Sequence, residues 1–209
     1  MQFSQEEVIG VLAKYNITPR GVLHIGAHEC EEISFYKRIG INENNIIWID
    51  AIPKKVEEAK ARGIKNVYQA VVADTDGKDI EFKITNNVQS SSILDFGTHT
   101  KHHSWVHFVD TLKLKTSTIQ ALYKENGWDP EKYDFWNFDI QGAELMALKG
   151  AGDILSNVKV LYLEVNAEEV YKGCGLIGEI DTYVASYGFE RVCTKMACSG
   201  WGDAIYIKK

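Results

Sequence analysis

The most constraining feature of this chain is an apolar segment that ends in a carboxylate and leads through a glycine turn into a helix-like segment. It covers residues 133–145, and Asp139 is the carboxylate. Ligands of open α/β sheets bind outside the carboxyl ends of the strands, so we expect Asp139 and the turn behind it to face a bound molecule. Residues 22–29 have the same design, with their turn at Gly26. The two junctions together predict one shared ligand crevice.

Strand-like and helix-like segments alternate along most of the chain, and two strands joined by a loop end it. Periodicity, caps and breakers predict helices over residues 4–15, 29–38, 53–60, 118–126 and 177–187, and strands over residues 22–25, 45–49, 67–73, 80–84, 133–138, 158–165, 189–193 and 204–207. This order predicts an α/β fold with a mostly parallel sheet and one antiparallel strand near its edge.

Length and composition predict one domain over residues 1–209. With 209 residues, of which 45% are hydrophobic and 25% charged, the chain can bury one sizeable core. Within it we expect an N-terminal helix in residues 1–20. Over residues 86–109 we expect a long irregular loop that serves as a lid or substrate loop, because this stretch holds three consecutive serines and four of the six histidines.

Charge and the distribution of apolar residues limit the kinds of ligand and the cellular compartment that we expect for this protein. A formal net charge of -6 argues against nucleic acid and favours a small-molecule or glycan ligand. The first residues lack the basic flank and apolar run of a secretory signal, and no segment is apolar for long enough to cross a bilayer, so we expect no membrane association. The four cysteines lack paired spacing and are expected to be reduced thiols in the cytoplasm.

The turn at Gly26 lets a ligand approach the backbone closely, and the residues around it narrow the kind of ligand. His28, Cys30 and Glu31 stand where a dinucleotide fingerprint would have further glycines, which disfavours NAD and FAD. Asp50 ends the next predicted strand, where a carboxylate is placed to accept the hydroxyls of a ribose. The alternative for Asp50 is a solvated carboxylate at a strand end.

Several segments resemble, in chain order, the successive motifs of FkbM-like S-adenosylmethionine-dependent methyltransferases. They are residues 22–28, 49–50, 90–94, 137–145, 148–151 and 163–166. The resemblance spans residues 22–207. It implies the class I methyltransferase fold, a Rossmann-like seven-stranded sheet with a terminal antiparallel hairpin and helices on both faces. It also implies O-methylation, the transfer of a methyl group to a hydroxyl of a sugar, glycan or related small molecule.

The resemblance also implies roles for individual positions. Contacts to S-adenosylmethionine would come from Gly26, Ala27 and His28 along the methionine part, Asp50 at the ribose, Gln69 and Ala70 near the adenine, and Asp139 toward the sulfonium or the acceptor.

Three positions depart from the pattern of that family. His24 and Gln120 stand where aspartate is common, and Gln141 stands where glutamate is common. The residue at position 24 weakens the expected support for the glycine turn. The residue at position 141 removes a charge from the site, so a mechanism that needs a second carboxylate must recruit Glu144 or Glu164.

Methyl transfer from a sulfonium to a hydroxyl is an in-line displacement, so the protein must supply alignment and a general base near the acceptor oxygen. Asp139 is the first candidate for this base, although it also fits a helix-capping role. A histidine of the expected loop is the second candidate, and His103 represents it. Glu164 is a further catalytic candidate, because it ends a strand at the same crevice.

A divalent metal has two conceivable sites. His99, His103 and His107 are spaced four apart and would share one face of a helix, but a preceding glycine disfavours that helix. Alternatively, a metal could bridge Asp139 and Glu164 to the acceptor hydroxyls, as in some sugar methyltransferases of this fold.

Two other functions fit parts of the sequence. One is a nucleotide-dependent oxidoreductase on a Rossmann sheet, which the missing glycines and the terminal hairpin disfavour. The other is a non-catalytic binding module that keeps the fold, which the departures at positions 24, 120 and 141 allow.

Overall fold

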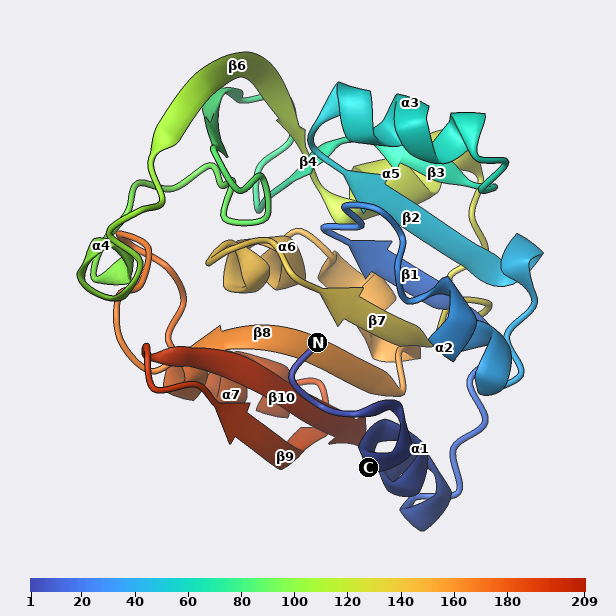
Figure 1. Cartoon of the computed structure of the whole chain (residues 1–209). Coiled ribbons are helices and arrows are strands. Elements are labelled where there is room, and N and C mark those ends of the chain that lie inside the picture. The colour runs from blue at the N-terminus through green and yellow to red at the C-terminus, as the bar shows by residue number, and fades with distance from the viewer.

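The computed structural model covers residues 1–209 and contains a seven-stranded sheet with helices on both faces (Figure 1). In spatial order the strands are β3 (Val67–Gln69), β2 (Ile46–Asp50), β1 (Val22–Ile25), β7 (Phe135–Phe138), β8 (Val160–Asn166), β10 (Trp201–Lys208) and β9 (Phe189–Met196). The first five are parallel, and β10 runs antiparallel to both of its neighbours. The expected class I methyltransferase fold, with its terminal antiparallel hairpin, is confirmed.

Three helices cover each face of this sheet. On one face lie α1 (Gln5–Lys14), α2 (Ile33–Arg38) and α3 (Pro53–Ala61), and on the other lie α5 (Ile119–Asn126), α6 (Glu144–Lys149) and α7 (Ile177–Ala185). Strands β1, β2, β7 and β8 are buried along their whole length, because helices on both faces remove both sides of a parallel strand from water. Two short 3-10 helices, η1 (Glu43–Asn45) and η2 (Gly152–Asn157), and the single turn α4 (His99–His102) lie in the connections.

The N-terminal segment is held against the antiparallel end of the sheet. Ser4 and Glu7 form the capping box that begins α1, with the Ser4 N–H donating to the Glu7 carboxylate at 2.8 Å. The same carboxylate pairs with Lys195 of β9 at 2.7 Å. The backbone N–H of Gln2 donates to the carboxylate of Asp203 in β10. Residues that precede α1 therefore lie beside the last strands of the chain.

A second sheet of three strands stands beside the main one, and the sequence predicts only part of it. β4 (Val71–Val72) is parallel to β6 (Phe108–Ser117), which is antiparallel to the expected strand β5 (Asp79–Thr85). The strand expected over residues 67–73 divides at Ala70 into β3 and β4, which belong to different sheets. Sequence reasoning misses β6, because most of its residues are exposed and no apolar run marks it.

The prediction of a helix over residues 29–38 is wrong for its first turn, because α2 begins only at Ile33. His28 (φ 42°) and Cys30 (φ 57°) adopt left-handed backbone conformations that a right-handed helix excludes. The Cys30 N–H instead donates to the Ala27 carbonyl at 2.6 Å and closes a compact turn. The segment after β1 is therefore a turn and not a helix N-terminus.

The ends of three strands are packed directly against one another at Gly26. The N–H groups of Gly26 and Ala27 donate to the Ile49 carbonyl at 2.9 and 3.0 Å, and the Asp139 N–H donates to the Ile25 carbonyl at 3.0 Å. Gly26 has a φ of 86°, and a Cβ at this position would lie 1.8 Å from the Asp139 carbonyl oxygen. Only glycine fits here, so this contact sets the spacing between the turns that follow β1 and β7.

A buried carboxylate holds the turn that follows β7. Glu144 opens α6, is 1% exposed, and accepts the N–H groups of Ile140 at 2.8 Å and Gly142 at 3.1 Å. Burial raises the pKa of Glu144 to about 8, and the nearby charge of Asp139 acts in the same direction. The turn is therefore closed by a carboxyl group that is favoured in its protonated form at neutral pH.

None of the helices combines the length and apolar character needed to span a membrane. The four cysteines are free thiols, and two of them, Cys30 and Cys174, are buried.

Replacing Gly26 with alanine should destabilise the protein. The left-handed backbone alone costs a non-glycine residue about 1 to 3 kcal/mol, and the clash with the Asp139 carbonyl adds to that cost. Gly10→Ala is the matched control, because Gly10 is exposed in α1 with open space around it, and alanine there should stabilise the helix by about 0.5 to 1 kcal/mol. Urea denaturation measures both changes, and a Gly26→Ala variant as stable as the wild type would contradict the packing at this turn.

Replacing Glu144 with glutamine should change how stability depends on pH. A glutamate in the unfolded chain ionises near pH 4.5, whereas folded Glu144 keeps its proton up to about pH 8. The folded state binds more protons between these values, so this group makes the free energy of unfolding fall as the pH rises through that range. Glutamine keeps an acceptor for the turn but does not ionise, so the variant should gain stability relative to wild type between about pH 5 and about pH 8. Urea denaturation across this range would contradict the account if the difference stayed constant.

Candidate active site

Two cavities meet at the carboxyl ends of β1, β2 and β7. The first has mainly apolar walls, and the second is the larger of the two and has mainly polar walls. Both cavities are lined by Gly26, His28, Gln89, Asp139 and Gln141. The two strand-end turns singled out in the sequence therefore contribute to one continuous site, and a group held in the first cavity is within reach of a molecule in the second.

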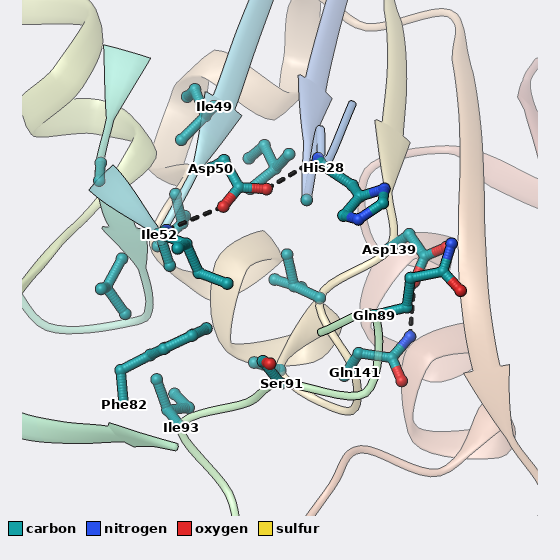
Figure 2. A pocket seen from close by; sticks show the side chains of 18 of the residues that line it. His28, Ile49, Asp50, Ile52, Phe82, Gln89, Ser91, Ile93, Asp139 and Gln141 are labelled. Carbon is teal, nitrogen blue, oxygen red and sulfur yellow. Dashed lines mark hydrogen bonds between the residues drawn. The ribbon is translucent and has the colours of Figure 1, made fainter. Parts of the chain in front are cut away.

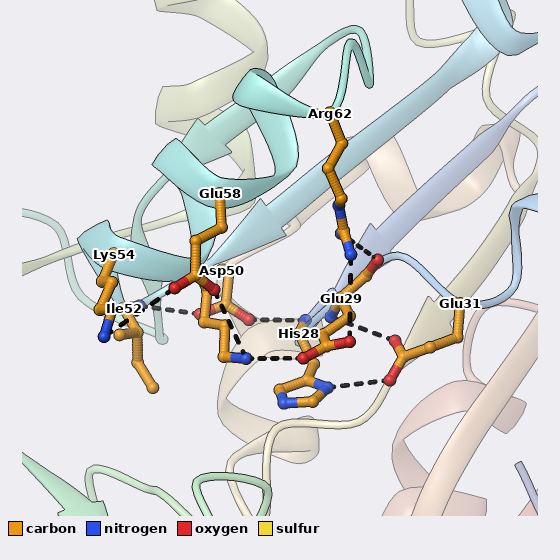
Figure 3. Close-up of polar contacts among 9 residues, drawn as sticks. His28, Glu29, Glu31, Asp50, Ile52, Lys54, Glu58 and Arg62 are labelled. Atoms are coloured by element: carbon orange, nitrogen blue, oxygen red, sulfur yellow. Dashed lines mark hydrogen bonds and ion pairs between the residues drawn. The ribbon is translucent and has the colours of Figure 1, made fainter.

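Asp50 faces the first cavity from the end of β2. One of its carboxylate oxygens accepts the His28 N–H at 2.8 Å and the other accepts the Ile52 N–H at 2.8 Å (Figures 2 and 3). Burial raises the pKa of Asp50, and the two backbone N–H groups oppose that rise. Each oxygen still has a lone pair that no protein group uses, so the carboxylate can accept two further hydrogen bonds.

Charged contacts fix the turn after β1 (Figure 3). His28 Nδ1 lies 2.9 Å from a carboxylate oxygen of Glu31, and this hydrogen bond raises the pKa of His28. The Glu29 carboxylate pairs with Lys55 of α3 at 2.9 Å, and Arg62 donates to the Glu29 carbonyl at 2.6 Å. Each exposed pair contributes little alone, but together they tie the turn to α3. These contacts hold in place the backbone N–H of His28, which donates to the Asp50 carboxylate.

Apolar side chains surround the carboxylate of Asp50. Ile49 and Ile52 flank it, and Phe82 and Ile93 form the opposite wall of the first cavity (Figure 2). This combination of one carboxylate with flat, apolar walls suits a ligand that carries both hydroxyls and an aromatic ring.

The other positions expected to contact a cosubstrate differ in whether they line a cavity. Ala70 lines the first cavity. Gln69 is exposed, lines neither cavity, and donates its side-chain amide to the Ala51 carbonyl at 3.1 Å. Ala27 is 2% exposed within the core and also lines neither cavity. The implied contacts of Ala27 and Gln69 to a cosubstrate therefore have no side-chain basis in this structure.

Gln141 connects the two strand-end carboxylates of the site. Its side-chain amide donates to Asp139 at 2.6 Å and to Glu164 at 2.7 Å, and its amide oxygen accepts from the Tyr171 hydroxyl at 2.6 Å. Both donors and one of the two acceptor lone pairs of the amide group are thus used inside the site. Glutamine at this position acts as a neutral bridge between carboxylates.

Asp139 is not a helix cap. Its carboxylate accepts a hydrogen bond only from Gln141, whereas Glu144 accepts the backbone N–H groups of the turn. Asp139 is exposed to the space where the two cavities meet. A carboxylate with free lone pairs at this junction can accept a proton from a bound hydroxyl.

Glu164 lies at the end of β8 and is 4% exposed. Burial, together with the charges of Asp139 and Glu144, raises the pKa of Glu164 well above its usual range. Burial and these neighbouring charges therefore favour the protonated form of Glu164.

The histidines expected in a loop do not form a metal site. α4 contains only one turn, so His99, His103 and His107 do not share a helix face, and His107 Nδ1 lies 3.1 Å from the Trp105 carbonyl oxygen. His99 and His103 line the second cavity and contact each other with ring centroids 5.0 Å apart. No group of three or more histidine, cysteine, aspartate or glutamate side chains has a metal-binding arrangement, including that around Asp139.

The three residues that differ from the family pattern are not all part of the site. His24 is 2% exposed, lines the second cavity, and lies 2.9 Å from the Tyr36 hydroxyl, and burial lowers its pKa to about 4. Gln141 lies at the centre of the site. Gln120 lines neither cavity, and its backbone N–H donates to the Gly150 carbonyl at 3.0 Å.

Residues 86–93 contribute more to the site than the sequence indicates. Ser92 Oγ donates to the Gln141 carbonyl at 2.9 Å, and the Ser90 carbonyl accepts from the Tyr171 hydroxyl at 3.3 Å. Val88 lines the first cavity with a φ of 62°, which is rare for a β-branched residue. The sequence indicates a functional segment here through its three consecutive serines and the family-like motif over residues 90–94, but not these individual contacts.

Known structures similar to this one include two methyltransferases. A precorrin-6y C5,15-methyltransferase from Geobacter metallireducens GS-15 is 11% identical, with a TM-score of 0.47, and the match covers 99% of this chain and 90% of that one. A magnesium protoporphyrin IX methyltransferase from Synechocystis PCC 6803, solved with bound S-adenosylmethionine, is also 11% identical, with a TM-score of 0.44 and coverage of 98% and 78%.

A curated relative is the 2-O-methyltransferase NoeI from Sinorhizobium fredii. It is 25% identical to this chain over 114 residues, which is 51% of this chain and 46% of the relative. The matched region thus spans about half the length of that relative.

The family model described as the methyltransferase FkbM domain matches residues 24–191. The match includes both strand-end turns, Asp50, and the carboxylates Asp139 and Glu164. From this match over most of its length, we conclude that the chain belongs to the FkbM methyltransferase family.

Proposed function

We propose that this protein is an S-adenosylmethionine-dependent O-methyltransferase whose acceptor is a hydroxyl of a sugar, glycan or related small molecule. The observation that carries the proposal is the meeting of the two cavities at Asp139 and Gln141. A methyl donor in the first cavity and an acceptor in the second would face each other there. The membership of the chain in a methyltransferase family supports this reading.

The residues of the first cavity fit S-adenosylmethionine. Asp50 has unused lone pairs for two ribose hydroxyls, and Ile49, Ile52 and Phe82 offer apolar surface for an adenine ring. Gly26 lines both cavities, so its backbone borders the space that a ligand would occupy. S-adenosylmethionine supplies a methyl group on a positively charged sulfur, and the carboxylate of Asp139 is placed to stabilise that charge.

The residues between the cavities can remove the proton of the acceptor hydroxyl and hold the base that does so in position. Asp139 takes the proton of the acceptor hydroxyl, because its carboxylate is exposed at the junction and bonded only to Gln141. Gln141 and Tyr171 fix the direction of that carboxylate. Glu164, favoured in its protonated form, takes part as a hydrogen-bond partner and not as a second base.

The second cavity fits a polar, hydroxylated acceptor. Its walls are mainly polar, and Trp105 stands at 60% exposure where its ring can cover the apolar face of a sugar. The similarity to NoeI, described as a 2-O-methyltransferase, supports a hydroxyl acceptor. The acidic net charge and the absence of lysine and arginine from the cavity wall support our expectation that nucleic acid is not the substrate.

Replacing Asp50 with asparagine should weaken binding of S-adenosylhomocysteine, the demethylated product. Asparagine offers one acceptor oxygen where the carboxylate offers two and carries no charge, so we expect a loss of about tenfold or more. Isothermal titration calorimetry measures the affinity. Asp76→Asn is the matched control, because Asp76 is an exposed turn carboxylate far from both cavities. Tighter binding of NAD than of S-adenosylhomocysteine by the wild type would favour an oxidoreductase and contradict the proposal.

Replacing Asp139 with asparagine should slow methyl transfer and leave cosubstrate binding largely intact. Loss of a general base typically costs about 10² to 10⁴ in rate. A panel of hexoses, deoxyhexoses and their oligosaccharides with methyl-labelled S-adenosylmethionine provides the assay, and the affinity for S-adenosylhomocysteine provides the folding control. A wild type that binds S-adenosylhomocysteine but methylates no acceptor in the panel or in a cell extract would support a non-catalytic module instead.

A further inference from the structure

The wall of the second cavity has an unusual charge composition. It contains five carboxylic side chains and no lysine or arginine; the acids are Glu31, Glu32, Asp139, Glu164 and Asp203. Carboxylates are seldom buried without a positive partner, because removal from water penalises the charged form. Glu164 and Asp203 are buried and Glu32 is partly buried, whereas Glu31 and Asp139 are exposed, and no lysine or arginine of the wall balances the buried acids.

Two of these carboxylates stand directly opposite each other on neighbouring strands. Glu164 of β8 is paired with Asp203 of β10 in the antiparallel register, and both side chains are 4% exposed. Like charges directly opposite on a sheet destabilise it. The carboxylate of Asp203 is bonded to the Tyr162 hydroxyl and the Gln2 N–H, which are neutral donors and do not balance its charge.

The cations near the cavity do not balance these acids. His28 is hydrogen-bonded to Glu31 and serves that one carboxylate. His24 and His99 have pKa values lowered to about 4 by burial, so both are neutral at neutral pH. The α-amino group of Met1 lowers the pKa of Glu32 and of Asp203, yet burial still raises both values above their usual range.

His99 gives an independent indication of a missing ligand in the same cavity. Its side chain lines the wall, is 5% exposed, and stacks on Phe96 with ring centroids 4.4 Å apart. His99 Nδ1 is buried and has no hydrogen-bond partner. A buried polar atom without a partner costs stability unless a bound molecule satisfies it. The wall that carries these acids therefore also contains a histidine whose hydrogen-bonding capacity the protein leaves unused.

We infer that the acceptor carries a protonated amine beside its hydroxyls, as an amino sugar does, and that Glu32 and Asp203 bind the ammonium group. This inference rests on the proposed function and specifies its substrate class. An ammonium group has three donors and a compact positive charge, so it can pair with several carboxylates at once. The negative charge of these carboxylates repels phosphorylated sugars and uronic acids. When the ammonium group is bound, the hydroxyl next to it on the acceptor faces Asp139.

Calorimetry on the full chain saturated with S-adenosylhomocysteine tests this inference with matched sugars. The probes are glucosamine and galactosamine, their parent hexoses, their N-acetyl forms and glucuronate, at about pH 6.5, where a primary amine is protonated. We expect each hexosamine to bind about tenfold more tightly than its parent hexose and its N-acetyl form, with no binding of glucuronate. The preference should shrink as salt concentration rises.

Variants connect the preference to the named carboxylates. Glu32→Gln and Asp203→Asn should each reduce the preference for the amine several-fold, and two variants are used because Asp203 also holds the N-terminal segment. Glu125→Gln is the matched control, because Glu125 is an exposed carboxylate on α5 that lines neither cavity. The control should bind all probes as the wild type does.

Three results would overturn the inference. They are equal affinity for hexosamine and hexose, no measurable binding of any hexosamine, and amine-independent binding that appears only with added Mg²⁺, which would assign the acids to a metal. Each of these results leaves the proposed function standing as long as S-adenosylhomocysteine binds. Failure of S-adenosylhomocysteine to bind would instead contradict the proposed function itself.

Discussion

The contact between Gly26 and the backbone of Asp139 is the constraint on which the site depends. Because a Cβ at position 26 would overlap the Asp139 carbonyl, the turns after β1 and β7 can approach each other only with glycine there. The same turn is bonded to the Ile49 carbonyl, immediately before Asp50. One close backbone contact thus fixes the relative positions of two carboxylates that are distant in sequence, and the two cavities meet between them.

Electrostatics gives this arrangement its chemical character. Acidic groups gather at the carboxyl ends of β7 and β8 and at the amino end of the antiparallel strand β10, and burial raises the pKa values of Glu144, Glu164 and Asp203. The neutral amide of Gln141 lies among them and bonds to both Asp139 and Glu164. This environment favours positive charge, both on the sulfonium of a methyl donor and on an acceptor.

The fold was largely predictable from the sequence, because alternating buried strands and amphipathic helices leave strong periodic signals. The mostly parallel sheet with its terminal antiparallel hairpin, which is confirmed, follows from those signals. Strand β6 was not predicted, because most of its residues are exposed and the alternation of Leu112 and Leu114 with lysines is short. The first turn of the helix expected after β1 was wrong, because left-handed conformations at His28 and Cys30 are set by the local tertiary contacts and not by residue type.

The site was predictable only in part. Strand-end carboxylates are visible in a sequence, so Asp50, Asp139 and Glu164 could be singled out, and the structure brings Asp139 and Glu164 together through Gln141. Contacts that join distant segments leave no local signal, such as the bond from Ser92 to the Gln141 carbonyl or the pairing of Glu164 with Asp203.

The central claim is that Asp50 holds the ribose of an adenosyl cosubstrate. A crystal structure with S-adenosylhomocysteine tests it most directly: the account predicts both ribose hydroxyls within hydrogen-bonding distance of the Asp50 carboxylate and the sulfur next to Asp139, and a ligand bound elsewhere, with Asp50 bonded only to His28 and Ile52, would contradict it.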